Sequence, residues 1–137
     1  MKKVNEGILH TLAKIAEAND GSNVRFAAAL VCRNKIVSVG FNHKKSHPFQ
    51  KKYAKNSEAI FLHAEVHAIK NALRDLPVEE LSKCELYIAR VKRPQSFSNS
   101  FVWGMSKPCS GCARAIAEFG IKRTIYTTDE QGKYEVL

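Results

Sequence analysis

Two short stretches of the sequence carry side chains that could bind a metal ion. The first is LHAEVHAIKNAL at residues 62–73, with two histidines and a glutamate at the head of a helical pattern. The second is SKPCSGC at residues 106–112, in which Cys109 and Cys112 have the spacing of zinc ligands. Imidazole and thiolate groups are the usual zinc ligands in proteins. Either stretch alone is weak evidence, so the question is whether they form one site.

Both stretches lie where a loop is predicted to become a helix. In an open α/β sheet such helix starts gather along one edge, so His63 can meet the two cysteines despite their separation in sequence. Cys109 and Cys112 fall on one side of a first helical turn. The positive end of a helix also favours the thiolate form. We therefore predict a Zn2+ site made by His63, Cys109 and Cys112, with one coordination position open.

Glu65 suggests that the open coordination position has a catalytic role. A water molecule bound there would have a pKa of roughly 7, so that hydroxide is available at neutral pH. Glu65 is two residues from His63 and can lie beside the metal without being a ligand. It would take a proton from the water and deliver it to a leaving amine.

The combination of HAE at residues 63–65 and PCSGC at residues 108–112 resembles the zinc-dependent cytidine/deoxycytidylate deaminase superfamily. The resemblance extends to the hairpin-like segment at residues 25–42, which closes in Gly-Phe-Asn, and to the strand-like segment at residues 120–128. It covers about residues 5–128 and is strongest for the deoxycytidylate deaminase branch.

This resemblance implies hydrolytic deamination of cytosine to uracil, with zinc held by the three predicted ligands and Glu65 as the catalytic proton shuttle. It also implies that Asn42 contacts the sugar and that the backbone of Ala64 contacts the base. The other implied substrate-binding residues are Trp103, which would wall the pocket, and Ser106, Lys107 and Pro108. A homo-oligomer is implied as well.

Length and composition describe the scaffold for such a site. The chain has 137 residues, of which 45% are hydrophobic and 26% are charged, as expected of one globular domain over residues 1–137. No apolar run approaches the ~20 residues of a membrane span. The N-terminal segment has the pattern of an amphipathic helix and not of a signal peptide. We therefore expect a cytoplasmic protein without membrane partners.

The alternation of helices and apolar strands predicts helices on both faces of one sheet. The resemblance implies a three-layer α/β/α sandwich with one mixed sheet of about five strands. A helix to about residue 18 precedes two strands joined by a turn at Asn34–Lys35. A helix from residue 63 or 64 to about 74, a strand at 84–91, a loop at 92–107, a helix to 120 and a strand at 122–128 follow. Only nine residues remain after Thr128, so a last strand must return as an antiparallel hairpin.

The remaining cysteines, Cys32 and Cys84, lie in apolar, strand-like runs. We expect them to be small buried apolar residues, and without a secretion signal we expect no disulfide framework.

The net charge of +9 comes from the lysine-rich segment at residues 43–56 and from a second basic stretch with Arg90, Lys92, Arg93 and Lys107. This charge alone is equally compatible with a solvated surface and with the binding of an anion such as a nucleotide phosphate or a nucleic-acid backbone. Candidate phosphate-binding residues are Lys44, Lys45, Lys51 and Lys52. We predict a pyrimidine nucleotide as substrate, with conversion of dCMP to dUMP preferred. The alternative is a cytosine or adenine deaminase of single-stranded DNA or RNA, with Trp103 or Phe101 stacking on a base. A free nucleoside would not need this charge, although the antiparallel tail resembles the nucleoside branch.

His67 allows an alternative in which the protein is a zinc-binding module and not an enzyme. His63 and His67 are four residues apart and could share a zinc ion with Cys109 and Cys112. Such a closed Cys2His2 site would be structural and non-catalytic. It would leave Glu65 without a role.

Overall fold

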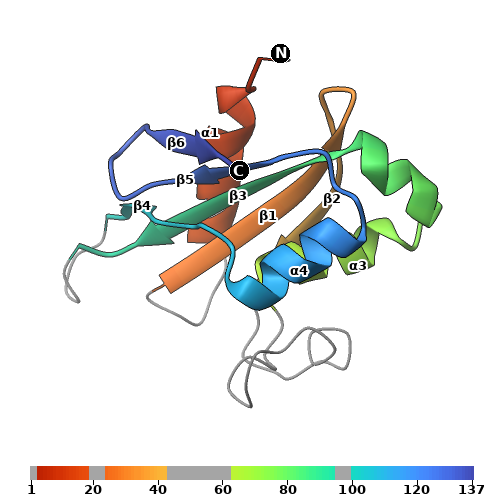
Figure 1. Ribbon diagram of the computed structural model, residues 1–137. Coiled ribbons are helices and arrows are strands. Elements are labelled where there is room, and N and C mark those ends of the chain that lie inside the picture. Colours follow the sequence, from red (N-terminus) through yellow and green to blue (C-terminus); the bar gives the residue numbers. More distant parts are fainter. Residues whose placement is uncertain (1–2, 19–23, 43–62, 95–99) are drawn as a thin grey trace.

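The computed structural model describes residues 3–18, 24–42, 63–94 and 100–137 (Figure 1). In chain order the elements are α1 (Glu6–Glu17), β1 (Val24–Cys32), β2 (Lys35–Phe41), α3 (Ala64–Ala72), the 3-10 helix η2 (Val78–Lys83), β3 (Glu85–Lys92), β4 (Val102–Gly104), α4 (Ser110–Glu118), β5 (Thr124–Thr127) and β6 (Tyr134–Val136). None of the described helices is long and apolar enough to cross a membrane.

The strands form one mixed sheet with the order β2-β1-β3-β5-β6, and β4 also pairs with β3. β3 and β5 run parallel, while the other described pairs are antiparallel. The predicted antiparallel return of the last strand is confirmed by the pairing of β6 with β5. The sheet has six strands where about five were predicted, because β4 lies within the segment predicted as a loop.

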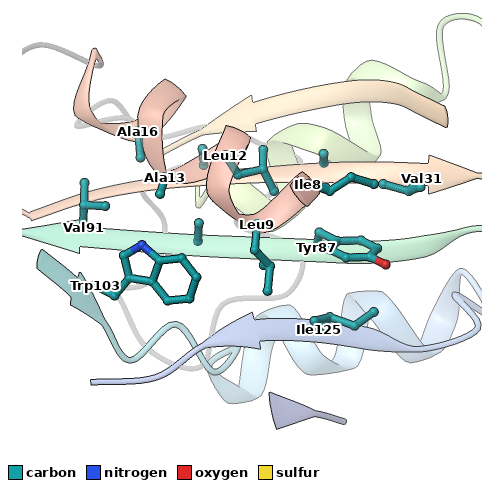
Figure 2. Close-up of a cluster of buried hydrophobic side chains, with 13 residues drawn as sticks. Ile8, Leu9, Leu12, Ala13, Ala16, Val31, Tyr87, Val91, Trp103 and Ile125 are labelled. Atoms are coloured by element: carbon teal, nitrogen blue, oxygen red, sulfur yellow. The ribbon is translucent and has the colours of Figure 1, made fainter. Parts of the chain in front are cut away.

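α1 covers one face of the sheet (Figure 1). Its apolar residues recur at helical spacing and pack on side chains from β1, β3 and β5, as Figure 2 shows. Leu9 and Leu12 are fully buried at the centre of this contact. Burial of such a side chain stabilises the fold by roughly 1.5–3 kcal/mol, so this helix is held by packing.

α3 and α4 cover the opposite face, where a second cluster of buried side chains joins them to the sheet (Figure 1). Ile69 of α3 and Ile116 of α4 belong to this cluster, with Leu86 and Ile88 of β3. Alternate residues of β3 therefore point to opposite faces, as a strand buried on both sides requires. The predicted three-layer α/β/α arrangement is confirmed.

α3 lies unusually close to the edge strand β2. A Cβ atom on Gly40 would lie 2.3 Å from the backbone N of Ala68, so only glycine fits at this position. The hydroxyl of Ser38 donates to the Ala68 carbonyl at 2.8 Å, and the amide of Asn71 donates to the Val39 carbonyl at 2.9 Å. The first bond satisfies a carbonyl of the helix and the second a carbonyl of the edge strand, and together they fix α3 against β2.

The predicted position of the turn between β1 and β2 is wrong by one residue. The β1–β2 turn is formed by Arg33 and Asn34, with φ angles of 55° and 64°, and not by Asn34 and Lys35. Positive φ at both central residues is the geometry of a two-residue hairpin turn whose twist matches the strands.

Cys32 and Cys84 form a disulfide, with a Cα–Cα distance of 4.5 Å. The expectation that these cysteines are unbonded is therefore wrong. Val31 pairs with Glu85 across β1 and β3, which places the next residue of one strand opposite the preceding residue of the other. The strand register, which sequence patterns do not give, brings the two sulfur atoms together.

Candidate metal centre

His63, Cys109 and Cys112 meet at the starts of α3 and α4. The Nδ1 atom of His63 lies 3.3 Å from the Sγ of Cys112 and 3.6 Å from the Sγ of Cys109. The three ligand atoms all lie within 4.8 Å of one another. Tetrahedral zinc with ordinary bond lengths places a nitrogen and a sulfur ligand about 3.6 Å apart. The spacing and the chemistry of these donors therefore fit Zn2+.

Local backbone structure explains why these side chains converge. His63 is the extended residue that precedes α3, and Cys109 has the same place before α4. The Sγ of Cys109 accepts a hydrogen bond from the backbone N–H of Cys112 at 3.5 Å, so this ligand also caps its helix. Cys112 is fully buried, whereas Cys109 is exposed and His63 is half-buried. The centre is therefore reached from the side of Cys109.

The electrostatics of the centre favour the thiolate form of Cys109. Hydrogen bonds from Cys112 and then from His63 lower the pKa of Cys109 to about 3, against a smaller opposing effect of burial. The hydrogen bond to Cys109 raises the pKa of His63. Cys109 is consequently a thiolate at neutral pH, which is the form that binds a metal.

Glu65 lies in the first turn of α3 and only 5% of its surface is exposed. Burial is the largest cause that raises its pKa, and the nearby charge of His63 acts in the opposite direction. In the described part of the chain, the group of close metal-type ligands consists of the histidine and the two cysteines, and Glu65 is outside it. The charges of His63 and Cys109 and a hydrogen bond with Cys112 also act on its pKa, so the carboxyl is beside the centre and not part of the ligand set.

His67 is also outside this ligand set. Its Nδ1 atom accepts a hydrogen bond from the backbone N–H of Phe41 at 2.9 Å. This nitrogen therefore holds α3 to the end of β2. The arrangement favours the three-ligand site over the closed Cys2His2 site.

Ser106 has a structural set of partners. It is 1% exposed, and its Oγ lies 3.1 Å from the Ile88 carbonyl and 2.9 Å from the Oγ1 of Thr127. Its backbone N–H donates to the Thr127 carbonyl at 3.0 Å. The hydroxyl of Ser106 therefore fixes the segment that leads to Cys109, and its contact with a substrate stays a prediction.

Trp103 lies on the α1 face of the sheet (Figure 2). Its ring contacts the ring of His10 at a centroid distance of 5.0 Å. It is 4% exposed. The zinc ligands are on the α3 and α4 side, so this placement corrects the prediction that Trp103 walls the pocket. The pairing of β4 with β3 turns the indole toward the core, and the sequence pattern did not reveal this strand.

The other predicted substrate contacts are placed as follows. Asn42 follows β2, and its Oδ1 accepts a hydrogen bond from the backbone N–H of Phe26 at 3.0 Å. Ala64 and Pro108 are buried next to the ligands, and Lys107 is exposed. The four candidate phosphate-binding lysines, Lys44, Lys45, Lys51 and Lys52, lie outside the described residues.

The sequence marks Arg90 only as part of a basic stretch with Lys92, Arg93 and Lys107, and it gives no role to Phe26. The guanidinium carbon of Arg90 lies 5.4 Å from the centre of the Phe26 ring. Its Nη1 donates to the Met105 carbonyl at 3.2 Å. The two-residue periodicity of the strands could have placed both side chains on the α3 and α4 face.

The chain matches the family model of the cytidine and deoxycytidylate deaminase zinc-binding region over residues 2–128. Among curated proteins, no relative matches. The chain is similar to the crystal structure of cytidine deaminase from Burkholderia pseudomallei, with a TM-score of 0.59 and 21% identity, covering 98% of this chain and 92% of the other.

Two structures of dCMP deaminase from the cyanophage S-TIM5 are also similar. The apo form has a TM-score of 0.57 and 19% identity, covering 93% of this chain and 85% of the other. The complex with dCMP and dUMP has a TM-score of 0.50 and 18% identity, covering 88% and 76%. At these identities the likeness concerns the fold. The family match covers nearly the whole chain and includes the three converging ligands. The chain therefore belongs to the cytidine and deoxycytidylate deaminase family, whose zinc-binding region it carries.

Proposed function

We propose that the protein catalyses the hydrolytic deamination of cytosine to uracil in a mononucleotide, with dCMP as the preferred substrate. The observation that carries this proposal is the position of Glu65, a buried carboxyl beside three zinc-type ligands but outside their group. A structural zinc site has no need of such a group. The overall reaction adds the oxygen of water at C4 of the base and releases the amino group as ammonia.

A bound zinc ion with an open position would supply Lewis acidity, which lowers the pKa of water toward 7. Glu65 would accept one proton from that water and deliver it to N3 of the base, and would then carry the second proton of the same water to the departing amine. The effect of burial on the pKa of Glu65 moves it toward the range in which a carboxyl can both take and give a proton near neutral pH. Asn42 would hold the sugar, and the backbone of Ala64 would hold the base.

The choice of a mononucleotide over a nucleic acid strand has its own support. Trp103 is buried under α1, and the ring of Phe101 has the guanidinium groups of Arg25 and Arg93 at 4.8 Å and 5.3 Å. The buried indole of Trp103 has no free face on which a base could stack, and at the Phe101 ring a base would compete with two guanidinium groups. One of the similar structures contains dCMP and dUMP, which supports a nucleotide ligand here. A homo-oligomer and a cytoplasmic location stay predictions.

The test is a comparison of uracil production from cytidine, deoxycytidine, CMP, dCMP, dCTP, a cytosine-containing DNA strand and an RNA strand at equal concentrations. We expect the highest kcat/KM for dCMP. Turnover of a strand alone would replace the proposal by a nucleic-acid deaminase. Zinc-loaded protein that deaminates nothing in this series would contradict the proposed reaction.

A further inference from the structure

The strand β3 carries one arginine on the same face as the metal centre. Leu86 and Ile88 of β3 belong to the buried cluster beneath α3 and α4, and Arg90 is the next residue in that alternation. Phe26 and Met105, the residues that Arg90 touches, also pack against this cluster. The half-buried guanidinium therefore lies on the α3 and α4 side of the sheet.

The contacts of Arg90 leave most of its donors for a ligand. A guanidinium carries five N–H donors. Within the part of the chain that the structure describes, the guanidinium forms one hydrogen bond, from Nη1 to the Met105 carbonyl at 3.2 Å, and its charge also acts on the Asp129 carboxyl. Its Nε is buried and has no acceptor among the described residues. The side chain runs past Gly104, where an added Cβ would lie 3.0 Å from its Cδ, and its guanidinium carbon lies 5.4 Å from the centre of the Phe26 ring. These neighbours fix its direction.

A short chain of contacts connects Arg90 to the proposed sugar-binding residue. Asn42 accepts the backbone N–H of Phe26, and the Phe26 ring lies beside the guanidinium. On the other side, Met105 is held by Arg90 and precedes the segment that ends in Cys109. In a nucleotide the sugar separates the base from the 5′-phosphate. If the base is at the metal centre and the sugar at Asn42, the phosphate continues toward Arg90.

We propose that Arg90 binds the 5′-phosphate of the substrate and thereby selects a nucleotide over a nucleoside. This inference rests on the proposed deaminase function and adds a specificity-determining residue to it. A planar guanidinium can bind phosphate oxygens through two parallel hydrogen bonds, which suits a site that distinguishes a charged group from a hydroxyl.

Three other cationic side chains near Arg90 already contact other groups. Lys92 forms an ion pair with Asp129 at 3.1 Å. Arg25 and Arg93 lie over the ring of Phe101, which packs against the cluster on the α1 face. Arg93 is three residues from Arg90 and has the same charge on the opposite face, so it is a matched control.

The experiment measures kcat/KM for dCMP and for deoxycytidine in the wild-type protein, Arg90→Gln and Arg93→Gln, all loaded with zinc. The loss of a charge-assisted hydrogen bond to phosphate should lower kcat/KM for dCMP in Arg90→Gln by about 10- to 100-fold. The value for deoxycytidine should change little. Arg93→Gln should keep the wild-type ratio, and Arg90→Lys should recover part of the preference because it keeps the charge.

An equal loss for both substrates in Arg90→Gln would show that Arg90 only holds the Met105 segment, and would overturn the inference. A wild-type protein with no preference for dCMP would overturn it too. Binding of dUMP and deoxyuridine, measured by calorimetry, gives a readout that does not need turnover. If wild type binds dUMP more tightly but deaminates nothing, the proposed function fails while the phosphate contact is still tested by the Arg90→Gln variant.

Discussion

His67 accepts a hydrogen bond at Nδ1 from the backbone N–H of Phe41, at 2.9 Å. The histidine that could have closed the metal site instead holds α3 to the end of the edge strand. The next residue after Phe41 is Asn42, the proposed sugar contact. The hydrogen bond therefore has two consequences. His67 stays outside the three-ligand centre, and the backbone next to Asn42 is fixed.

Replacement of a zinc ligand should remove the metal. We expect Cys109→Ser and Cys112→Ser to lose stoichiometric zinc, because a hydroxyl is a much poorer zinc ligand than a thiolate. Zinc content measured by mass spectrometry on purified protein checks this. Cys32→Ser is the control, since it removes a cysteine in the disulfide with Cys84 and should keep full zinc. Retention of zinc by both ligand variants would refute the assignment.

Thr127 should be important for stability because its hydroxyl joins three elements. It accepts the backbone N–H of Arg90 at 3.1 Å and donates to the Gly104 carbonyl at 2.8 Å, and the residue is fully buried. Thr127→Val keeps the shape but leaves buried polar groups unpaired, at about 1–3 kcal/mol for each. We expect a loss of about 2 kcal/mol or more in urea unfolding. Thr127→Ser keeps the hydroxyl and should lose about 1 kcal/mol or less; equal losses would contradict this explanation.

Gly40→Ala tests the contact between β2 and α3. The added Cβ would lie 2.3 Å from the Ala68 nitrogen and 2.5 Å from the Ala64 carbonyl oxygen, both of which are backbone atoms. Helix and strand would have to separate, at a cost of about 3 kcal/mol or more. Gly132→Ala is the comparison, because that position has φ of 80° but open space around it. Thermal unfolding should show a much larger decrease for Gly40→Ala.

The Asp129 side chain predicts a pH effect on stability. The hydrogen bond from Lys92, and next the one from the Met105 backbone N–H, lower the pKa of Asp129 from its ordinary value of 3.8. A carboxyl with a lowered pKa in the folded state stabilises the fold above its ordinary pKa, and this contribution is lost as the pH falls toward the folded-state value.

The measurement is urea unfolding of the wild-type protein and Asp129→Asn from about pH 7 to about pH 3. The stability difference between them should be constant near neutral pH and should shrink as the solution becomes acidic. A difference that grows with acidity has the opposite sign and would contradict the assignment.

The periodic elements and the zinc ligands could be predicted from the sequence. The strand segments at 24–32, 35–41 and 85–92 are marked by continuous or alternating apolar residues, and two helix starts carried the ligand motifs. Such signals lie within short segments, so they can be recognised without knowledge of the tertiary structure. The alternation of helices and strands was then enough for the layered fold.

Features that depend on strand register could not be predicted. β4 has three residues and exists through its pairing with β3, and this pairing turns Trp103 to the α1 face. The Cys32–Cys84 disulfide depends on which residues of β1 and β3 are opposite. The role of Ser106 follows from its contact with Thr127, 21 residues later in the chain. No local sequence pattern predicts these contacts between residues that are far apart in the chain.

The measurement that tests the central claim most directly compares Glu65→Gln with the wild-type protein for zinc content and dCMP deamination in the same samples. Gln keeps the size of the buried side chain and removes its ability to carry a proton. We expect full zinc content and a loss of turnover of at least about 100-fold. Glu79→Gln, at an exposed position, should retain both properties. A Glu65→Gln protein that keeps zinc and deaminates dCMP at the wild-type rate would contradict the account.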